Sequence, residues 1–225
     1  QGAADAVIFE DCIFADGANY GLALWTSGLS CIVRRCVFFG NEDYQLSFYD
    51  ASGVGDSGHL VQNCVFKHNY TGALKSWAVA GFDVQDCTFL GSAYGLDVQD
   101  FPGGYTAVNV TNSIFAYLFR GLKAGVAGQI VEDYCNYYAN TGDRQNVAVG
   151  AHSTTYPPLL LPPHLVDGGG YKLSWVMDEL SLWSQVARIA DDGAAPTVDL
   201  YGLARPATAG KVSWGAVQYQ GPARD

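Results

Sequence analysis

A short phrase of alternating apolar and polar residues recurs six times in the first two-thirds of this 225-residue chain. Its copies read VIFEDCIF, CIVRRCVF, LVQNCVF, FDVQDCTF, VNVTNSIF and IVEDYCNYY. They align on one small residue, which we call the ladder position: Cys12, Cys36, Cys64, Cys87, Ser113 and Cys135. Successive ladder positions are 22 to 28 residues apart, and an imperfect period of that length is typical of one coil of a solenoid.

Two further positions of each phrase carry mostly apolar residues. Three residues before the ladder position stand Phe9, Val33, Val61, Val84, Val110 and Glu132, and two after it stand Phe14, Phe38, Phe66, Phe89, Phe115 and Tyr137. Apolar residues two apart indicate a strand with one buried face. Asp or Asn precedes the ladder residue in four copies, which predicts a sharp bend in the left-handed backbone region. Arg35 and Tyr134 depart from this rule.

A further strand is expected after each phrase, in YGLALW, YQLSFY, GALKSW, YGLDVQ, RGLKAG and NVAVG. The inward residues of these segments align as Leu22, Leu46, Leu74, Leu96, Leu122 and Val147. One such unit cannot bury its apolar face alone, but stacked units share a continuous core. The sequence therefore predicts an all-β fold, a parallel β-helix of about six coils over residues 1–152.

The motif V-x-(N/D)-C-x-F followed by Y-G-L, as in residues 84–96, resembles the repeats of right-handed parallel β-helix proteins of the pectate-lyase-like superfamily. The resemblance covers roughly residues 7–150. Its members include polysaccharide lyases, glycoside hydrolases, adhesins and phage tailspikes, so it implies a fold and leaves the activity open.

Residues 153–225 resemble the C-terminal segment of secreted bacterial β-helix proteins, through the phrases DLYGLARP at 199–206 and WGAVQY at 214–219. Residues 174–190 fit a short amphipathic helix within this segment. We expect residues 153–225 to pack on the solenoid and to cover the strand edges of its last coil.

Composition limits the partners of the protein. The chain has 22 acidic and 12 basic residues and a net charge of -10, which disfavours nucleic acid and anionic lipid. No run of 18 apolar residues predicts a membrane span. The many glycines and tyrosines, with 15% charged residues, are typical of β-rich extracellular proteins. Because the sequence begins with Gln1, we expect an exported chain whose signal was removed, located outside the cell or on its surface.

The two ends of the predicted solenoid differ. Only QGAADA precedes the first coil, which is too little for a capping helix. An uncovered strand edge invites pairing with another strand or another solenoid. We therefore expect another protein subunit to stack on the N-terminal coil as one of the two partners considered, the other being a polysaccharide.

The row of cysteines is expected to pack rather than to react. Its members should lie about 4.8 Å apart, where buried cysteine behaves as a small hydrophobe. In-register neighbours on parallel strands point their Cβ atoms the same way, which suits a disulfide badly. No CxxC motif or adjacent histidine indicates a metal site, and the sequence predicts none.

The outward residues of the third strand suggest a binding surface. If Leu22 and Leu24 point inward, their neighbours point outward. The outward rows are Ala23, Ser47, Lys75, Asp97 and Lys123, then Trp25, Tyr49, Trp77, Gln99 and Gly125. Aromatic rings stack on sugars, and lysines attract uronic or sulfated groups. We predict a carbohydrate-binding strip of Trp25, Tyr49, Trp77, Lys75, Asp97 and Lys123. The alternative is that the tail or a long turn covers this strip, since large exposed apolar patches are uncommon.

The same strip holds the candidates for catalysis. The resemblance implies that a lyase of this fold would use a Lys or Arg base, often with calcium held by carboxylates, which indicates Lys75, Asp97, Lys123 and Arg120. One aligned aspartate is a poor calcium site, because that ion takes six to eight oxygens. A glycosidase needs two facing carboxylates, and neither Asp97 with Asp100 nor Asp50 with Asp100 forms a convincing pair.

Three functions therefore remain open. The sequence favours a surface protein that binds a glycan or packs into an assembly, without a catalytic site or cofactor. The second is a polysaccharide lyase acting on a uronate-containing glycan, with calcium as its cofactor. The third is a purely structural subunit of a fibre or complex, stacked end to end.

Overall fold

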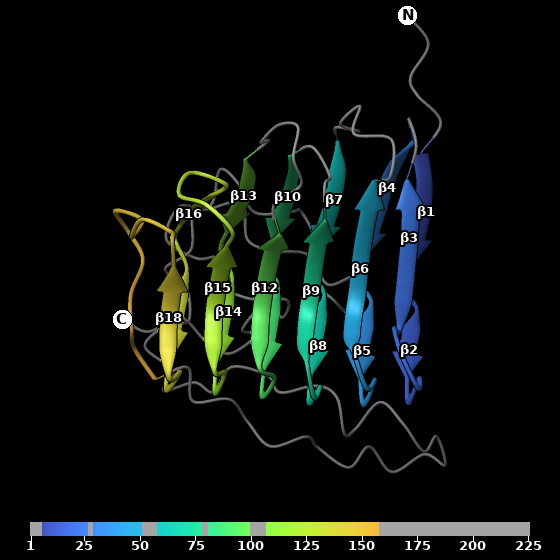
Figure 1. The fold of residues 1–225 in the computed structure, drawn as a ribbon, viewed down its shortest axis with the longest axis horizontal. Helices are drawn as coiled ribbons and strands as arrows, with labels where there is room; N and C mark the ends of the chain where they lie inside the picture. The colour runs from blue at the N-terminus through green and yellow to red at the C-terminus, as the bar shows by residue number, and fades with distance from the viewer. Residues whose placement is uncertain (1–5, 27–28, 51–57, 78–80, 100–106, 158–225) are drawn as a thin grey trace, which may run out of the picture.

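The computed structural model describes residues 6–26, 29–50, 58–77, 81–99 and 107–157. These residues form three six-stranded parallel sheets, in which each coil contributes one strand to each sheet (Figure 1). Sheet A contains β1 (Ala6–Glu10), β4 (Ser30–Arg34), β7 (His59–Gln62), β10 (Phe82–Gln85), β13 (Val108–Thr111) and β16 (Ile130–Asp133). Sheet B contains β2 (Ile13–Ala15), β5 (Val37–Phe39), β8 (Val65–Lys67), β11 (Thr88–Leu90), β14 (Ile114–Ala116) and β17 (Asn136–Tyr138). Sheet C contains β3 (Leu22–Thr26), β6 (Tyr44–Asp50), β9 (Gly72–Trp77), β12 (Tyr94–Gln99), β15 (Arg120–Ala124) and β18 (Gly142–Gln145).

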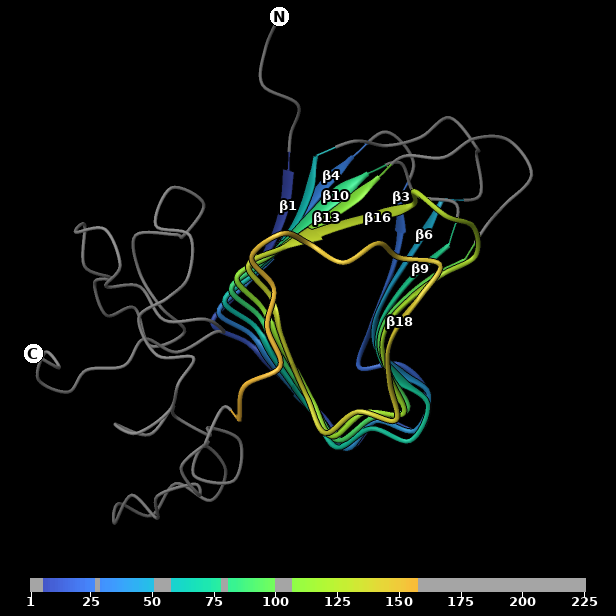
Figure 2. The ribbon, with the colours of Figure 1, turned by 90° about the vertical axis from the view of Figure 1, so that its left-hand side faces the viewer.

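Viewed along the solenoid axis, the coils superpose into a roughly triangular outline (Figure 2). The register places equivalent residues of the repeat side by side, as in the pairs Phe14 with Phe38 and Phe38 with Phe66. The predicted all-β parallel β-helix is confirmed. None of the described segments forms a helix long and apolar enough to cross a membrane.

The interior is built from rows of identical or similar side chains. The aromatic row from Phe14 to Tyr137 stacks with ring centroids 4.6 to 5.1 Å apart and nearly parallel planes. None of the six cysteines, all of which lie in the described ranges, forms a disulfide, and the thiol of Cys64 donates to the carbonyl oxygen of Gln62 at 3.3 Å. Burial raises the pKa of Cys64 well above its ordinary value, so this thiol stays protonated. The cysteine row therefore packs, as the sequence predicts.

The bend before the ladder position is left-handed in every coil. Its φ values lie between 51° and 56° at Asp11, Arg35, Asn63, Asp86, Asn112 and Tyr134. Arg35 and Tyr134 are thus no exceptions, which corrects the expectation from residue type. Hydrogen bonds between coils enforce the conformation, since the Arg35 amide donates to the Gln62 carbonyl at 3.0 Å.

A second left-handed position follows the ladder residue by four, and the sequence did not reveal it. It is occupied by Asp16, Gly40, His68, Gly91, Tyr117 and Ala139. Only two of these residues are glycines, so residue type hides the bend. This position ends each strand of sheet B.

The last coil departs from the sequence-based alignment. Its third strand is β18 rather than NVAVG, and Arg144 instead of Val147 pairs with Leu122. The guanidinium of Arg144 lies 3.9 Å from the centre of the Tyr137 ring and 2.7 Å from the Glu132 carboxylate. Glu132 is fully buried inside the coil and Arg144 is mostly buried, so an ion pair replaces the Val110 and Leu122 of the preceding coil.

Residues 146–157 pass over this end of the solenoid (Figure 2). The Ser153 hydroxyl accepts from the Cys135 amide at 3.0 Å, as the Ser113 hydroxyl does from the Cys87 amide at 3.2 Å. Thr154 forms a parallel bridge with Asn136. The ladder therefore gains a seventh member, Ser153. The predicted helix and most of the predicted 153–225 segment lie outside the described residues.

Candidate functional site

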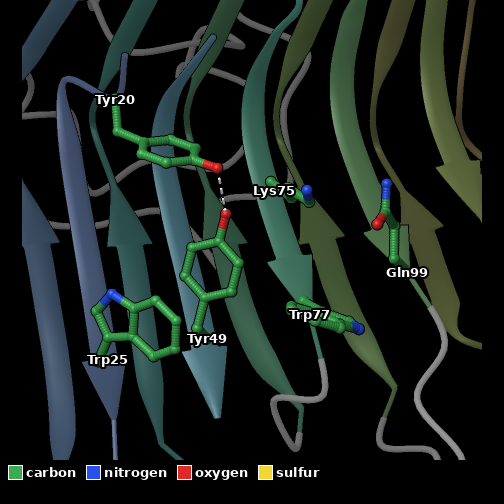
Figure 3. Close-up of a pocket in the computed structure, with 6 residues that line it drawn as sticks. All are labelled: Tyr20, Trp25, Tyr49, Lys75, Trp77 and Gln99. Atoms are coloured by element: carbon green, nitrogen blue, oxygen red, sulfur yellow. Dashed lines mark hydrogen bonds between the residues drawn. The ribbon is translucent and has the colours of Figure 1, made fainter. Parts of the chain in front are cut away.

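The outer face of sheet C carries a hollow of about 340 Å³. It lies over the first four coils, where the residues around it are drawn in Figure 3. The lining residues are Tyr20, Trp25, Tyr49, Lys75, Trp77 and Gln99. Four of them come from the outward row Trp25, Tyr49, Trp77 and Gln99, so the alternation of the strands places the predicted aromatic side chains on one face, as expected.

The ring of Tyr49 forms the floor of the hollow, and the rings of Trp25 and Trp77 flank it. Trp25 and Tyr49 stack with centroids 4.9 Å apart and a 17° angle, whereas Tyr49 and Trp77 meet edge to face at 5.8 Å. Trp25 is 71% exposed and Trp77 39%, while Tyr49 between them is only 6% exposed. Tyr49 therefore supports two tryptophans whose surfaces are exposed. The tail and the long turns that the covering alternative invokes lie outside the described residues.

Tyr20 lines the hollow from the turn before β3 and was not among the predicted site residues. The Tyr49 hydroxyl donates to the Tyr20 hydroxyl at 2.7 Å (Figure 3). This hydrogen bond, with burial and the nearby Asp43, raises the pKa of Tyr20 above its ordinary value. Tyr20 is consequently a neutral hydroxyl at neutral pH. Its position in a turn hides it from a search based on strand alternation.

Lys75 supplies positive charge to the hollow. Its ammonium lies 5.0 Å from the centre of the Tyr44 ring and 5.8 Å from that of Tyr49. These cation–π contacts hold the charge without neutralising it. Within the described part of the chain, Lys75 forms no ion pair with a carboxylate.

Asp97 lies beside the hollow but below its surface. The fully buried carboxylate accepts from the Tyr44 hydroxyl at 2.6 Å and from the Gln99 amide at 2.9 Å. The Lys123 ammonium lies 3.2 Å from the same carboxylate and 4.8 Å from the centre of the Tyr94 ring. The buried Asp97 thus pairs with the partly exposed Lys123 and orients Gln99, and neither Asp97 nor Lys123 lines the hollow.

Tyr44 reaches Asp97 across an intervening coil. Its ring passes over Gly72, where an added Cβ atom would overlap it. Burial, followed by the hydrogen bond to Asp97, raises the pKa of Tyr44 above its ordinary value. The absence of a side chain at Gly72 therefore allows Tyr44 of the second coil to reach and hydrogen-bond Asp97 of the fourth.

A family model described as a right-handed β-helix region matches residues 2–115. The chain belongs to the right-handed β-helix family. The matched range contains the first four coils and every residue of the hollow. A search of curated proteins and a search of solved structures each found no match. Membership in the β-helix family fixes the hand of the solenoid and leaves its activity open.

The four catalytic candidates of this β-helix have different surroundings. Lys75 borders the hollow, whereas Asp97 and Lys123 engage each other. Arg120 begins β15 and lies 5.6 Å from the centre of the Phe119 ring, outside the hollow. Among the described residues, no group of three His, Cys, Asp or Glu side chains is arranged to hold a metal. Lyase activity and its calcium ion remain predictions from the resemblance.

Proposed function

We propose that this β-helix is an extracellular or cell-surface protein that binds a carbohydrate chain in the hollow on sheet C. The observation that carries the proposal is the pair of exposed tryptophans, Trp25 and Trp77, held by the buried ring of Tyr49. Rigid aromatic surfaces lose little conformational entropy when a sugar ring stacks on them. Their fixation by Tyr49 supports a preformed site.

The distance between the two tryptophans suits a chain-like ligand. Trp25 and Trp77 stand on the first and third coils, two strand spacings or about 9.6 Å apart. A glycan running along the solenoid axis would contact both rings with successive sugar units. Gln99 donates its amide N–H to Asp97, which leaves its carbonyl oxygen to accept from a sugar hydroxyl.

The charge in the hollow favours an acidic glycan. The Lys75 ammonium lies between the tyrosine pair and Gln99 (Figure 3). A uronate carboxylate or a sulfate placed there would form a charge-assisted hydrogen bond with Lys75. Lys123 is less suited to this role because it already pairs with Asp97.

Affinity electrophoresis in gels containing neutral, uronate or sulfated polysaccharides tests the proposal. Trp25→Ala and Trp77→Ala should each lose about 1 kcal/mol of stacking, which weakens binding roughly five-fold. Lys75→Gln should weaken binding of the acidic polysaccharides alone. Tyr70→Ala, which removes an exposed aromatic outside the hollow, is the matched control. Equal retardation of wild type and both tryptophan variants in every gel would refute the proposal.

The first coil supports a second candidate, assembly with a second copy. In the described part of the chain, β1, β2 and β3 are the outer strands of their sheets, and the inward residues Phe9 and Phe14 are only partly buried. Free strand edges around an apolar centre favour stacking. The mass of the native particle decides this candidate, because a monomer at all concentrations excludes it. Val7→Asp, at an exposed position of β1, should dissociate any assembly.

A further inference from the structure

The outer face of sheet B, which we call the B face, is buried although it points away from the core. The stacked aromatics occupy the inner face, so the residues that flank them point outward. The B face consists of Val37, Val65, Thr88, Ile114 and Asn136 in one row and Phe39, Lys67, Leu90, Ala116 and Tyr138 in the other. Val65 is only 3% exposed and Ile114 only 1%.

These residues do not owe their burial to the interior of the solenoid. The cluster of apolar side chains that fills the interior includes neither Val65 nor Ile114. Sheet A provides the comparison, since its outward residue Val131 is 56% exposed. Outward side chains on the same solenoid thus differ between sheets A and B, and the low exposure of Val65 and Ile114 indicates that a further layer covers the B face.

The path of the chain indicates what this layer is. Asn136, the last member of the first row, bridges Thr154 and donates its side-chain amide to the Tyr156 carbonyl at 2.9 Å. The described chain therefore ends at Pro157 beside the B face. From β17 to β5 the face extends over four strand spacings, about 19 Å, which roughly six extended residues span. The residues that follow, 158–225, begin with a proline and three leucines at 158–161.

We propose that the B face is the docking surface for the chain's own residues 158–225. Burial of Val37, Val65 and Ile114 places the docked layer over the second to the fifth coil, and Asn136 extends it to the sixth. Ile13 on the first coil is exposed, so the layer stops before the N-terminal end. This location differs from the predicted covering of the last coil's edges, and it leaves the hollow on sheet C open.

A photo-crosslinking experiment on the full chain tests the docking. Phe39→p-benzoylphenylalanine places an aromatic photoprobe at a partly buried position of the B face. Phe119→p-benzoylphenylalanine, at an exposed position between β14 and β15, is the matched control. After irradiation, mass spectrometry should find crosslinks from position 39 to peptides of 158–225 within one chain, and none from position 119.

Crosslinks from position 39 to a second chain, or to residues 6–157 alone, would overturn the proposal, as would their absence. If the Phe39 variant fails to melt at the wild-type temperature, the probe goes to Tyr138 in the same row. Amine acetylation of the native wild type gives a second measurement. Lys67 is buried in the B face and should react at least about tenfold more slowly than Lys75. Equal rates would mean that the face is open.

Discussion

The buried pair of Glu132 and Arg144 allows a quantitative test of how the last coil is closed. The preceding coil has Val110 and Leu122 at the same positions. Glu132→Val, Arg144→Leu and the double variant therefore restore the apolar repeat one residue at a time. The three variants form a double-mutant cycle around a single ion pair.

The single variants should be strongly destabilised. Removing one partner of a buried ion pair leaves an uncompensated charge, at a cost of about 3–5 kcal/mol. Arg144→Leu leaves the carboxylate of Glu132, whose side chain is fully buried. Glu132→Val leaves the Arg144 guanidinium, which is slightly exposed and rests on the Tyr137 ring. It also removes the acceptor of the Gly150 amide and the Ser153 hydroxyl, so its cost should also be about 3–5 kcal/mol.

The double variant should lose much less. It removes both charges and rebuilds an apolar coil, but it still deprives the Gly150 amide and the Ser153 hydroxyl of the Glu132 carboxylate. Unsatisfied polar groups of this kind cost about 1–3 kcal/mol. The sum of the single effects should therefore exceed the double effect by more than about 2 kcal/mol.

Equilibrium urea unfolding, followed by circular dichroism, measures the cycle. The comparison requires equal m values, because a terminal coil that melts separately lowers m and breaks the two-state assumption. Val131→Ala, an outward and exposed change on β16, should leave the midpoint nearly unchanged. Additive effects of Glu132→Val and Arg144→Leu within about 0.5 kcal/mol would refute the coupling.

Three further changes test other parts of the structure. Gly72→Ala should lower the free energy of unfolding by about 1–3 kcal/mol, because the added Cβ atom would displace the Tyr44 ring. The loss should be smaller in the Tyr44→Ala background. An unchanged urea midpoint would contradict the close contact between Gly72 and the Tyr44 ring. Ala139→Gly, at φ 51° where Gly40 and Gly91 stand in other coils, should stabilise by about 0.5–1 kcal/mol; a lower melting temperature would argue against strain there. Hydrogen bonding to Arg34 holds the pKa of Glu10 below its ordinary value. The ionised Glu10 therefore stabilises the folded state above the unfolded pKa, and this contribution is lost as pH falls below about 4. The melting temperatures of wild type and Glu10→Gln should therefore differ at pH 6 and converge near pH 3, and a gap that persists in acid would exclude this cause.

The fold was predictable because most inward positions repeat their apolar chemistry through the first five coils. Six phrases that alternate with period two define the strands of sheets A and B, and the Leu22-type residues define five strands of sheet C. The sixth was misassigned because the apolar pattern leads to Val147, whereas the coil places Arg144 inside. A buried ion pair carries no periodic signal, so no search for apolar repeats would find it.

The backbone bends show the same limit. Asn63 and Asp86 reveal the left-handed position by residue type, but Arg35 adopts it as well. Its conformation is imposed by the hydrogen bonds between coils, and its side chain pairs with Glu10 and Asp11. Local propensity therefore predicts a bend where Asn or Asp stands and misses one that the stacking enforces.

The candidate site was predictable only as far as strand alternation reaches. Alternation placed Trp25, Tyr49, Trp77 and Lys75 on one face. Tyr20 enters from a turn, which has no fixed alternation. The burial of Asp97 depends on Tyr44, which is 53 residues away in sequence, and on the glycine between them. Such a contact across two coils follows from side-chain length and packing, which the repeat does not encode.

The difference between the two ends of the solenoid limits how copies of this chain can assemble. The last coil has a polar interior, Glu132 with Arg144, beneath residues 150–157, whereas the first coil presents Phe9 and Phe14. An apolar first coil placed on this polar end would remove the Glu132–Arg144 pair further from water without adding a polar partner for it, which disfavours head-to-tail stacking. Two first coils can instead meet face to face through the same surface, and such an isologous contact closes at two copies. Self-association should therefore yield a dimer in native mass measurements, and a ladder of higher oligomers would contradict this account of the ends.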